Sequence, residues 1–238
     1  MFRDYHRAPD VLFCVAGGST TQMGFLAEIE AKAIESCMES NYYSAVFCAQ
    51  SCLKRWLRDP SSTTRHMVFT SSTAAFVGLP GYISYTPAKV AVRALADTLR
   101  QELLLYGDST AYQVHCCFPG TFISEGFAEE RKFKPELTKQ LEGVDAPIEE
   151  LEKTEMSSLA VAKKTIAGLE KGDYFITVDL IGDLLLNNMR GPSPRDRPVY
   201  DFVLGLIAVV AWFFTRIDFD KKVSKYRGRM KSMGGSQP

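Results

Sequence analysis

The chain has 238 residues, of which 46% are hydrophobic and 24% are charged, and its formal net charge is zero. This length suits one sizeable domain, or one domain followed by a tail. The balance of 28 basic and 28 acidic residues provides no field that would attract a nucleic acid. Six cysteines stand without a C-x-x-C pair or histidines at metal-ligand spacing, so we expect reduced packing residues in a cytosolic environment and no metal site.

The first element expected is a buried parallel strand over residues 11–16. The run Val-Leu-Phe-Cys-Val-Ala is continuously apolar and ends at Gly17 and Gly18. Residues 27–56 then have helical character, with a break or bend near Asn41. Neither feature identifies a site by itself, because glycines commonly end strands and a mid-helix asparagine can bond its own backbone.

Residues 71–89 are the most informative stretch of the chain. They follow a β-type run, Met-Val-Phe-Thr, at residues 67–70 and lead into a helix expected over residues 88–106. Tyr85 and Lys89 are four residues apart at the entry to that helix, so both side chains lie on one face. Ser72 stands at the end of the preceding strand, and the loop between contains glycine and proline and can fold it back towards Tyr85.

These three side chains suit proton transfer to a carbonyl that is being reduced. A tyrosine with its ordinary pKa of about 10 is a poor acid or base at neutral pH. A lysine ammonium close by stabilises the phenolate and lowers that pKa, and a serine hydroxyl can donate to the substrate oxygen. A Tyr–Lys pair alone is most often an exposed surface pair. The serine spacing, the strand before it and the helix after it favour an active site.

A further strand is expected at residues 112–118, and it runs into the turn Pro119-Gly120-Thr121. His115 lies within this strand and is interpreted as a packing residue. Residues 157–171 predict an alanine-rich helix that Gly172 stops, and residues 174–178 predict the last strand.

The segment 202–214 contains thirteen uncharged, mostly apolar residues, and a basic tail follows it. A spanning helix needs about 20 such residues, so this length also suits a core helix or an interfacial segment. Trp212, the flanking phenylalanines and the basic tail favour contact with membrane lipids. A buried helix or a homo-oligomer contact is the alternative.

Ser72, then Tyr85 thirteen residues on, then Lys89 four further, resemble the active site of the short-chain dehydrogenases/reductases. The resemblance implies an α/β fold with a Rossmann-like, doubly wound, mainly parallel sheet. It implies that Tyr85 gives a proton to the carbonyl oxygen, that Ser72 orients this oxygen, and that Lys89 lowers the pKa of Tyr85 and bonds the nicotinamide ribose. Asn41 matches the family residue that disturbs a helix, so that a backbone carbonyl can hold a relay water.

The same resemblance implies a site for the cofactor, which is NADPH on family grounds only. Ala16 and Gly17 match the end of the family's Asn-Asn-Ala-Gly, and residues 119–121 match its Pro-Gly turn beside the nicotinamide. The implied cofactor contacts are Ala16, Gly17, Tyr85, Lys89, Pro119, Gly120 and Thr121. The polar residues 122–150 correspond to the mobile segment that covers the substrate.

From Asp10 to Phe219 the chain resembles the fungal-type 3-ketosphinganine (3-dehydrosphinganine) reductases. The resemblance rests on Ala-Gly without the two asparagines, on Lys-Pro-Glu-Leu-Thr at residues 134–138, and on the apolar end. It implies reduction of a long-chain sphingoid ketone to sphinganine at the cytosolic face of the endoplasmic reticulum membrane. Two alternatives stay open: a reductase for another lipid or steroid ketone, and a non-catalytic remnant acting as a membrane-bound partner.

The family's Thr-Gly-x-x-x-Gly-x-Gly motif, whose backbone amides cradle the pyrophosphate, does not occur in this sequence. We therefore expect an N-terminally truncated fold without the first three strands. Residues 1–190 would form the catalytic part, and residues 191–238 the membrane-associating helix and tail. The strand at residue 11 would become a sheet edge with exposed apolar side chains. Such a chain would bind NADPH poorly and turn over little by itself.

Overall fold

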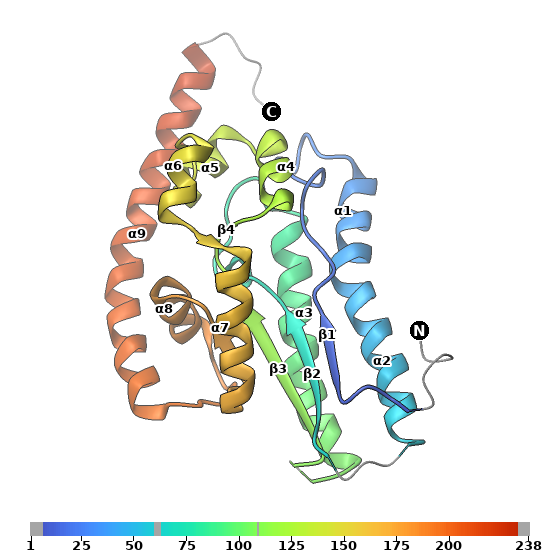
Figure 1. Ribbon diagram of the computed structural model, residues 1–238. Coiled ribbons are helices and arrows are strands. Elements are labelled where there is room, and N and C mark those ends of the chain that lie inside the picture. The colour runs from blue at the N-terminus through green and yellow to red at the C-terminus, as the bar shows by residue number, and fades with distance from the viewer. Residues whose placement is uncertain (1–6, 60–62, 109, 233–238) are drawn as a thin grey trace.

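The computed structural model describes residues 7–59, 63–108 and 110–232 (Figure 1). A four-stranded, fully parallel sheet forms the centre, in the order β1-β2-β3-β6. Its strands are β1 (Val11–Cys14), β2 (Arg65–Thr70), β3 (Tyr112–Phe118) and β6 (Phe175–Thr177). Four apolar runs therefore form the strands that the sequence predicts, because a strand buried on both faces needs a nearly continuous apolar run.

Helices connect these parallel strands, as parallel pairing requires. Between β1 and β2 lie α1 (Ala31–Met38), a five-residue π-helix (Glu39–Tyr43) and α2 (Ser44–Trp56). Between β2 and β3 lie a short 3₁₀ turn (Thr73–Ala75), α3 (Tyr85–Glu102) and a second 3₁₀ turn (Leu103–Leu105). The helix α7 (Ser158–Lys171) leads into β6.

The two faces of the sheet are covered by different layers. Cys116 belongs to the main core, together with Trp56, Phe69 and Val92, so this core lies between the sheet and the layer of α2 and α3. Its neighbour Cys117 packs on the opposite face, in a cluster with residues of α7 and β6. The adjacent cysteines thus point to opposite faces, because successive side chains of a strand alternate between its two faces. Helices on both faces confirm the doubly wound α/β fold.

Strand β1 is an edge of this sheet, since it pairs with β2 alone among the described strands. Its apolar side chains are exposed accordingly, with Val11 at 37%, Phe13 at 41% and Val15, just beyond the strand, at 59%. An edge with unpaired backbone groups and apolar side chains is what the sequence predicts for this strand.

Residues 122–157 form a small cap at the end of the sheet towards which the strands point (Figure 1). The cap contains a pair of two-residue strands and three short helices. They are β4 (Phe122–Ile123), α4 (Glu125–Phe133), α5 (Glu136–Glu142), α6 (Ile148–Thr154) and β5 (Met156–Ser157). The cap has its own apolar cluster around Phe127, Val144 and Leu151.

The chain ends in two helices, α8 (Leu180–Met189), which the sequence analysis did not predict, and α9 (Pro198–Ser232). The helix α9 is 35 residues long, far beyond the thirteen-residue apolar run from which it was predicted. It runs along one flank of the molecule and contacts α8 and α5 (Figure 1). Among the described helices it is the one that is long and apolar enough to cross a membrane, with a window of mean hydropathy 1.9 that is only 11% buried.

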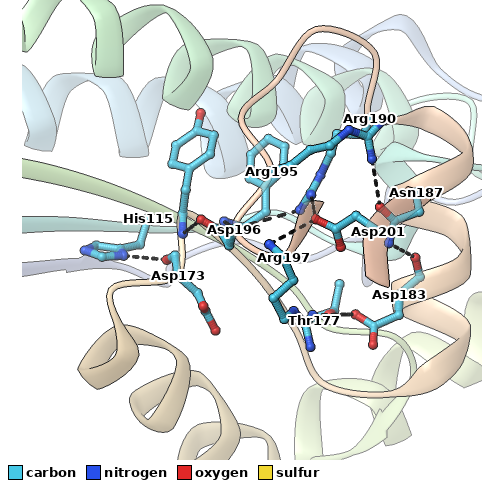
Figure 2. Close-up of polar contacts among 12 residues, drawn as sticks. His115, Asp173, Thr177, Asp183, Asn187, Arg190, Arg195, Asp196, Arg197 and Asp201 are labelled. Atoms are coloured by element: carbon cyan, nitrogen blue, oxygen red, sulfur yellow. Dashed lines mark hydrogen bonds and ion pairs between the residues drawn. The ribbon is translucent and has the colours of Figure 1, made fainter. Parts of the chain in front are cut away.

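An ionic network fixes the start of α9 to α8 and β6 (Figure 2). Arg190, at the end of α8, forms a buried ion pair with Asp201 of α9 and lies 3.9 Å from Asp196. Arg197 pairs with Asp183 of α8 at 3.5 Å. The Asp196 carboxylate also accepts the backbone N–H of Tyr174 at 3.1 Å, beside β6. The hydrophobic helix is therefore attached to the sheet at a defined place.

His115 is a satisfied core residue, as its place in the strand predicts. It is 1% exposed, and its Nδ1 lies 2.7 Å from the carbonyl oxygen of Asp173 (Figure 2). Its Nε2 lies 3.0 Å from Nδ1 of His66. Burial lowers the pKa of both histidines, so the pair is neutral at physiological pH.

Candidate active site

Ser72 lies just beyond the carboxyl end of β2, where it caps the first 3₁₀ turn. Its Oγ accepts the N–H of Ala74 at 3.1 Å, so the extended backbone of Ser72 begins the turn. The same hydroxyl donates to the carbonyl oxygen of Pro119 at 3.4 Å. The end of β2 and the Pro-Gly turn after β3 therefore meet at this serine.

Tyr85 is the first residue of α3, and Lys89 lies one turn further along the same face. The Lys89 Nζ lies 5.5 Å from the centre of the Tyr85 ring and donates to the carbonyl oxygen of Thr70 at 3.0 Å. Ser71 fixes this turn of the helix, since its hydroxyl donates to the backbone carbonyl of Lys89 at 2.8 Å. The structure thus brings Ser72, Tyr85 and Lys89 together at the carboxyl end of β2.

Burial and neighbouring charges shift the pKa values of Lys89 and Tyr85. Burial lowers the pKa of Lys89 to about 8. Burial raises the pKa of Tyr85, the Glu130 carboxylate raises it further, and a hydrogen bond with Ser72 opposes both effects. The pKa of Tyr85 is thus raised overall, because desolvation and the carboxylate dominate, and a lowering of this pKa by Lys89 stays a prediction.

Asn41 sits in the π-helix between α1 and α2, exactly where the sequence predicts a disturbed helix, and is 1% exposed. Its side chain holds the turn after β1: Nδ2 donates to the carbonyl oxygen of Gly18 at 2.8 Å, and Oδ1 accepts the N–H of Gly18 at 3.0 Å. Nδ2 also reaches the carbonyl oxygen of Cys37 at 2.9 Å. The amide thus satisfies both backbone groups of Gly18, a pairing that the sequence did not reveal.

Ala16 and Gly17 lie in the exposed turn that Asn41 holds. Gly17 has a φ of +136°, and a Cβ at this position would lie 2.4 Å from the Oδ1 of Asn41. Glycine is therefore required here by backbone conformation and by the close approach of the asparagine.

The turn at residues 119–121 is placed as the sequence predicts, directly after β3. The carbonyl oxygen of Pro119 accepts from Ser72 and from the N–H of Thr73, the latter at 3.0 Å. A Cβ at Gly120 would lie 3.3 Å from a carboxylate oxygen of Asp179, so the glycine permits a close approach. Thr121 donates its hydroxyl to Glu142 of α5 at 2.6 Å, which is a contact inside the protein.

Four further side chains near Tyr85 were not predicted from the sequence: Tyr82, Glu130, Lys134 and Glu142. Tyr82 precedes α3, and its ring centre lies 5.5 Å from that of Tyr85. Its hydroxyl shares its one proton between Glu130, at 3.2 Å, and Glu142, at 3.0 Å, and Lys134 bridges the two carboxylates. The i,i+4 spacing of Glu130 and Lys134 on α4 was the one available signal, because the other partners are far apart in sequence.

The residues present fit the nicotinamide and ribose end of a dinucleotide. The Lys89 ammonium has three donors, of which one is directed to Thr70, and the others suit ribose hydroxyls. The Tyr85 hydroxyl lies on the same helix face, and the turn at Gly120 lacks a side chain that would obstruct a ring. This donor set suits a polar, hydroxyl-rich group next to a flat ring.

The parallel sheet, the Ser72–Tyr85–Lys89 set and the π-helix at Asn41 define a class of protein. Residues 3–135 match the family model described as short chain dehydrogenase, which is more than half of the chain. The chain therefore belongs to the short-chain dehydrogenase family.

Within this family, the chain is similar to two curated fungal proteins. The 3-ketodihydrosphingosine reductase ksrA of Aspergillus fumigatus is 37% identical over 232 residues, which cover 90% of this chain and 60% of the relative. The 3-ketodihydrosphingosine reductase gsl-3 of Neurospora crassa is 36% identical over 229 residues, covering 92% and 59%. The chain thus spans about three fifths of the length of these relatives.

Solved structures agree on the fold. A short chain dehydrogenase/reductase from Burkholderia phymatum in complex with NAD aligns with a TM-score of 0.60 and 19% identity, covering 77% of this chain and 64% of the other. A short chain dehydrogenase from Burkholderia cenocepacia in complex with NADP aligns with a TM-score of 0.56 and 17% identity, covering 82% and 68%. Both confirm the Rossmann-like architecture.

Proposed function

We propose that this chain is the catalytic part of a reductase that converts 3-ketosphinganine (3-ketodihydrosphingosine) to sphinganine in sphingolipid synthesis. The observation that carries the proposal is the assembly of Ser72, Tyr85 and Lys89 at one point of the sheet. The names of the two fungal relatives support the substrate, since each is a 3-ketodihydrosphingosine reductase.

In this mechanism Tyr85 donates its hydroxyl proton to the carbonyl oxygen of the substrate. Ser72 donates a hydrogen bond to the same oxygen and holds it next to Tyr85. A nicotinamide cofactor supplies the hydride that the carbonyl carbon receives. Lys89 binds the ribose hydroxyls, and Asn41 holds the turn at Ala16 and Gly17 against the site while its disturbed helix offers a carbonyl to a relay water.

We propose NADPH as the cofactor, held by Ala16, Gly17, Tyr85, Lys89, Pro119, Gly120 and Thr121. Thr121 is bonded to Glu142 in the structure, so a contact to the nicotinamide amide requires this hydroxyl to exchange partners. Comparing the rates with NADPH and NADH tests the choice, and an equal or greater rate with NADH would contradict it.

We further propose that residues 191–238 attach the catalytic part, residues 1–190, to the cytosolic face of the endoplasmic reticulum membrane. The exposed apolar surface of α9 supports attachment, because few of its side chains are covered by the rest of the protein. A long-chain ketone partitions into lipid, so a membrane-bound catalyst meets its substrate there.

The test compares ketone reduction by the wild-type chain, Tyr85→Phe and the control Tyr43→Phe, which alters an exposed tyrosine on the π-helix. Loss of the proton donor should lower the rate with 3-ketosphinganine by about 10²-fold or more, whereas the control should keep it. Steroid and acyl ketones, assayed in parallel, should react more slowly. Because the chain by itself is expected to turn over slowly, the deciding comparison is made at a wild-type rate that exceeds the background without protein. A measurable wild-type rate that Tyr85→Phe leaves unchanged would contradict the proposal and favour a non-catalytic binding partner.

A further inference from the structure

A buried lysine of the cap lies between two carboxylates next to the candidate active site. The side chain of Lys134, at the end of α4, is 0% exposed. Its Nζ lies 2.8 Å from Oε1 of Glu130 and 2.5 Å from Oε2 of Glu142. It also lies 5.4 Å and 5.3 Å from the ring centres of Tyr82 and Phe127. A charge this deeply buried is stable only while its partners stay in place.

The two carboxylates each hold hydroxyl groups that come from the loops of the site. Ser19, in the turn after β1, donates to Oε2 of Glu130 at 2.8 Å. Thr121, in the turn after β3, donates to Oε1 of Glu142 at 2.6 Å. Tyr82, in the loop before α3, shares its hydroxyl proton between the two carboxylates. Every loop that carries a candidate site residue beside the cap is thus tied to the group that Lys134 holds together.

A second contact places the same cap on the loop before Tyr85. The Thr138 hydroxyl of α5 donates to the carbonyl oxygen of Pro80 at 2.6 Å. The next residue, Gly81, has a φ of +94°, and a Cβ there would lie 2.2 Å from the Thr138 Oγ1. Since Tyr82 packs against the ring of Tyr85, a shift of the cap would move Tyr85 as well.

We propose that Lys134 is a positioning residue for Tyr85 and that Glu130 is its electrostatic counterpart. The ammonium holds Glu130 and Glu142 together, so that these three side chains carry one net negative charge beside Tyr85. The same contacts keep the loops of the site in fixed positions relative to one another. This inference rests on the proposed function only in taking Tyr85 as the proton donor. The titratable groups that face Tyr85 are Glu130 of α4, Glu142 of α5, Cys37 of α1, Lys89 of α3 and Tyr82 of the preceding loop.

Substitutions at the two residues should change the proton affinity of Tyr85 in opposite directions. Lys134→Met leaves two neighbouring carboxylates without their cation, and their added negative charge should raise the pKa of Tyr85. Glu130→Gln keeps the shape of the side chain and leaves Lys134 paired with Glu142 alone, so the local charge becomes zero and the pKa should fall. A merely structural contact would not produce opposite shifts.

A measurement without substrate or cofactor tests this directly. The chain is labelled with 3-fluorotyrosine, the ¹⁹F signal of Tyr85 is assigned by its loss in Tyr85→Phe, and it is followed up to the highest pH at which circular dichroism stays native. Tyr85 should ionise at lower pH in Glu130→Gln than in the wild type, and at higher pH in Lys134→Met. The matched controls are Lys132→Met and Glu129→Gln, an exposed ion pair on the same helix, and both should leave the signal unchanged.

The second readout is the pH profile of ketone reduction. Its alkaline limb should move to lower pH in Glu130→Gln and to higher pH in Lys134→Met. Lys134→Met should also lower the rate at neutral pH by about tenfold, since a weaker acid transfers its proton more slowly. If Lys134→Met does not fold, Glu130→Gln still decides. A Tyr85 signal in Glu130→Gln that follows the wild type throughout the range overturns the inference. Opposite NMR shifts in a chain whose measurable ketone reduction is unchanged by Tyr85→Phe would keep the inference and reject the proposed function.

Discussion

Lys89 carries an ammonium group to a position that is only 4% exposed. Burial lowers its pKa to about 8, because the low-dielectric surroundings disfavour the charged form, and the nearby Cys116 and Cys37 oppose this effect only in part. In an active site such a lysine is useful, since its charge is available to a ligand that enters with hydroxyl groups. The folded chain bears the cost of keeping it charged.

The stability of the chain should therefore depend on pH through Lys89. Below pH 8 the lysine is charged in the folded and unfolded states, and folding buries a charge. Between about pH 8 and the unfolded pKa of about 10.5, the folded state loses the proton first, so this group stabilises the fold increasingly as pH rises. The free energy of unfolding of the wild type, minus that of Lys89→Met, should thus increase by about 3 kcal/mol across this window.

Urea unfolding of both proteins at several pH values measures this difference. Cysteines and tyrosines that titrate in the same range are common to both proteins and cancel in the subtraction. The control is Lys54→Met, which removes an exposed lysine of α2. A difference that is flat for Lys89→Met, or equally steep for Lys54→Met, would contradict the explanation by burial.

At the residue scale, the sequence predicts where the site residues lie better than it predicts the shifts of their pKa values. The spacing of Ser72, Tyr85 and Lys89 follows from one strand, one loop and one helix entry, so local pattern is sufficient to bring them together. The pKa of Tyr85 is raised by its burial and further by Glu130 and Glu142, which approach it only through the packing of the cap. The hydrophobic periodicity of the sequence does not predict this contact between the cap and Tyr85.

At the scale of elements, the predictions succeed where a run of residues has one clear period. The strand at residues 112–118 is found with its exact bounds, because every residue of it pairs with β2 or β6 and the last five are buried. The helix α8 was missed, since it follows β6 after only two residues and its apolar side chains continue those of the strand. The basic tail is helical because lysine and arginine are good helix formers and i,i+4 pairs such as Asp218–Lys222, at 2.9 Å, support it.

The start of α9 depends on one buried ion pair. Asp201 is 1% exposed and faces Arg190, which is 2% exposed. Asp201→Ala would leave the guanidinium buried, with the more distant Asp196, at 3.9 Å, as its one carboxylate partner among the residues that the structure describes. We expect a loss of about 3–5 kcal/mol in the free energy of unfolding, the usual cost of an uncompensated buried charge.

Chemical denaturation of Asp201→Ala and of the control Asp218→Ala tests this expectation. Asp218 also pairs with a cation, Lys222, one turn further along α9, but both side chains of this pair are about half exposed. The Asp218→Ala substitution should therefore lower the free energy of unfolding by less than about 1 kcal/mol. Similar losses for the two variants would show that burial of the pair does not contribute to the attachment of α9.

At the scale of the whole molecule, α9 has two different sides. A stripe of Asp201, Leu204, Ala208 and Trp212, spaced three or four residues apart, faces the protein. Most other large apolar side chains between residues 199 and 217 are exposed: Val199, Phe202, Val203, Leu206, Ile207, Val209, Val210, Phe213, Phe214 and Ile217. Exposed basic residues follow on the same helix, among them Lys221, Lys222 and Lys225. An exposed apolar surface followed by cations suits a bilayer with anionic headgroups.

The chain should therefore bind lipid vesicles through α9, and more weakly at high salt, because screening weakens the contact between lysines and headgroups. Phe213 and Phe214 are each 64% exposed, and burying a phenylalanine in an apolar phase contributes about 1.5–3 kcal/mol. The double substitution to aspartate should therefore lower the vesicle partition coefficient by at least about 100-fold, as measured by flotation with phosphatidylcholine and phosphatidylserine. Leu105→Asp is the control, since Leu105 is 78% exposed but lies in the 3₁₀ turn that follows α3, outside α9. Equal losses of vesicle binding in the two variants would locate the lipid contact outside α9. A loss confined to the phenylalanine variant would place the candidate active site and its cap beside the membrane, because α5 of the cap contacts α9.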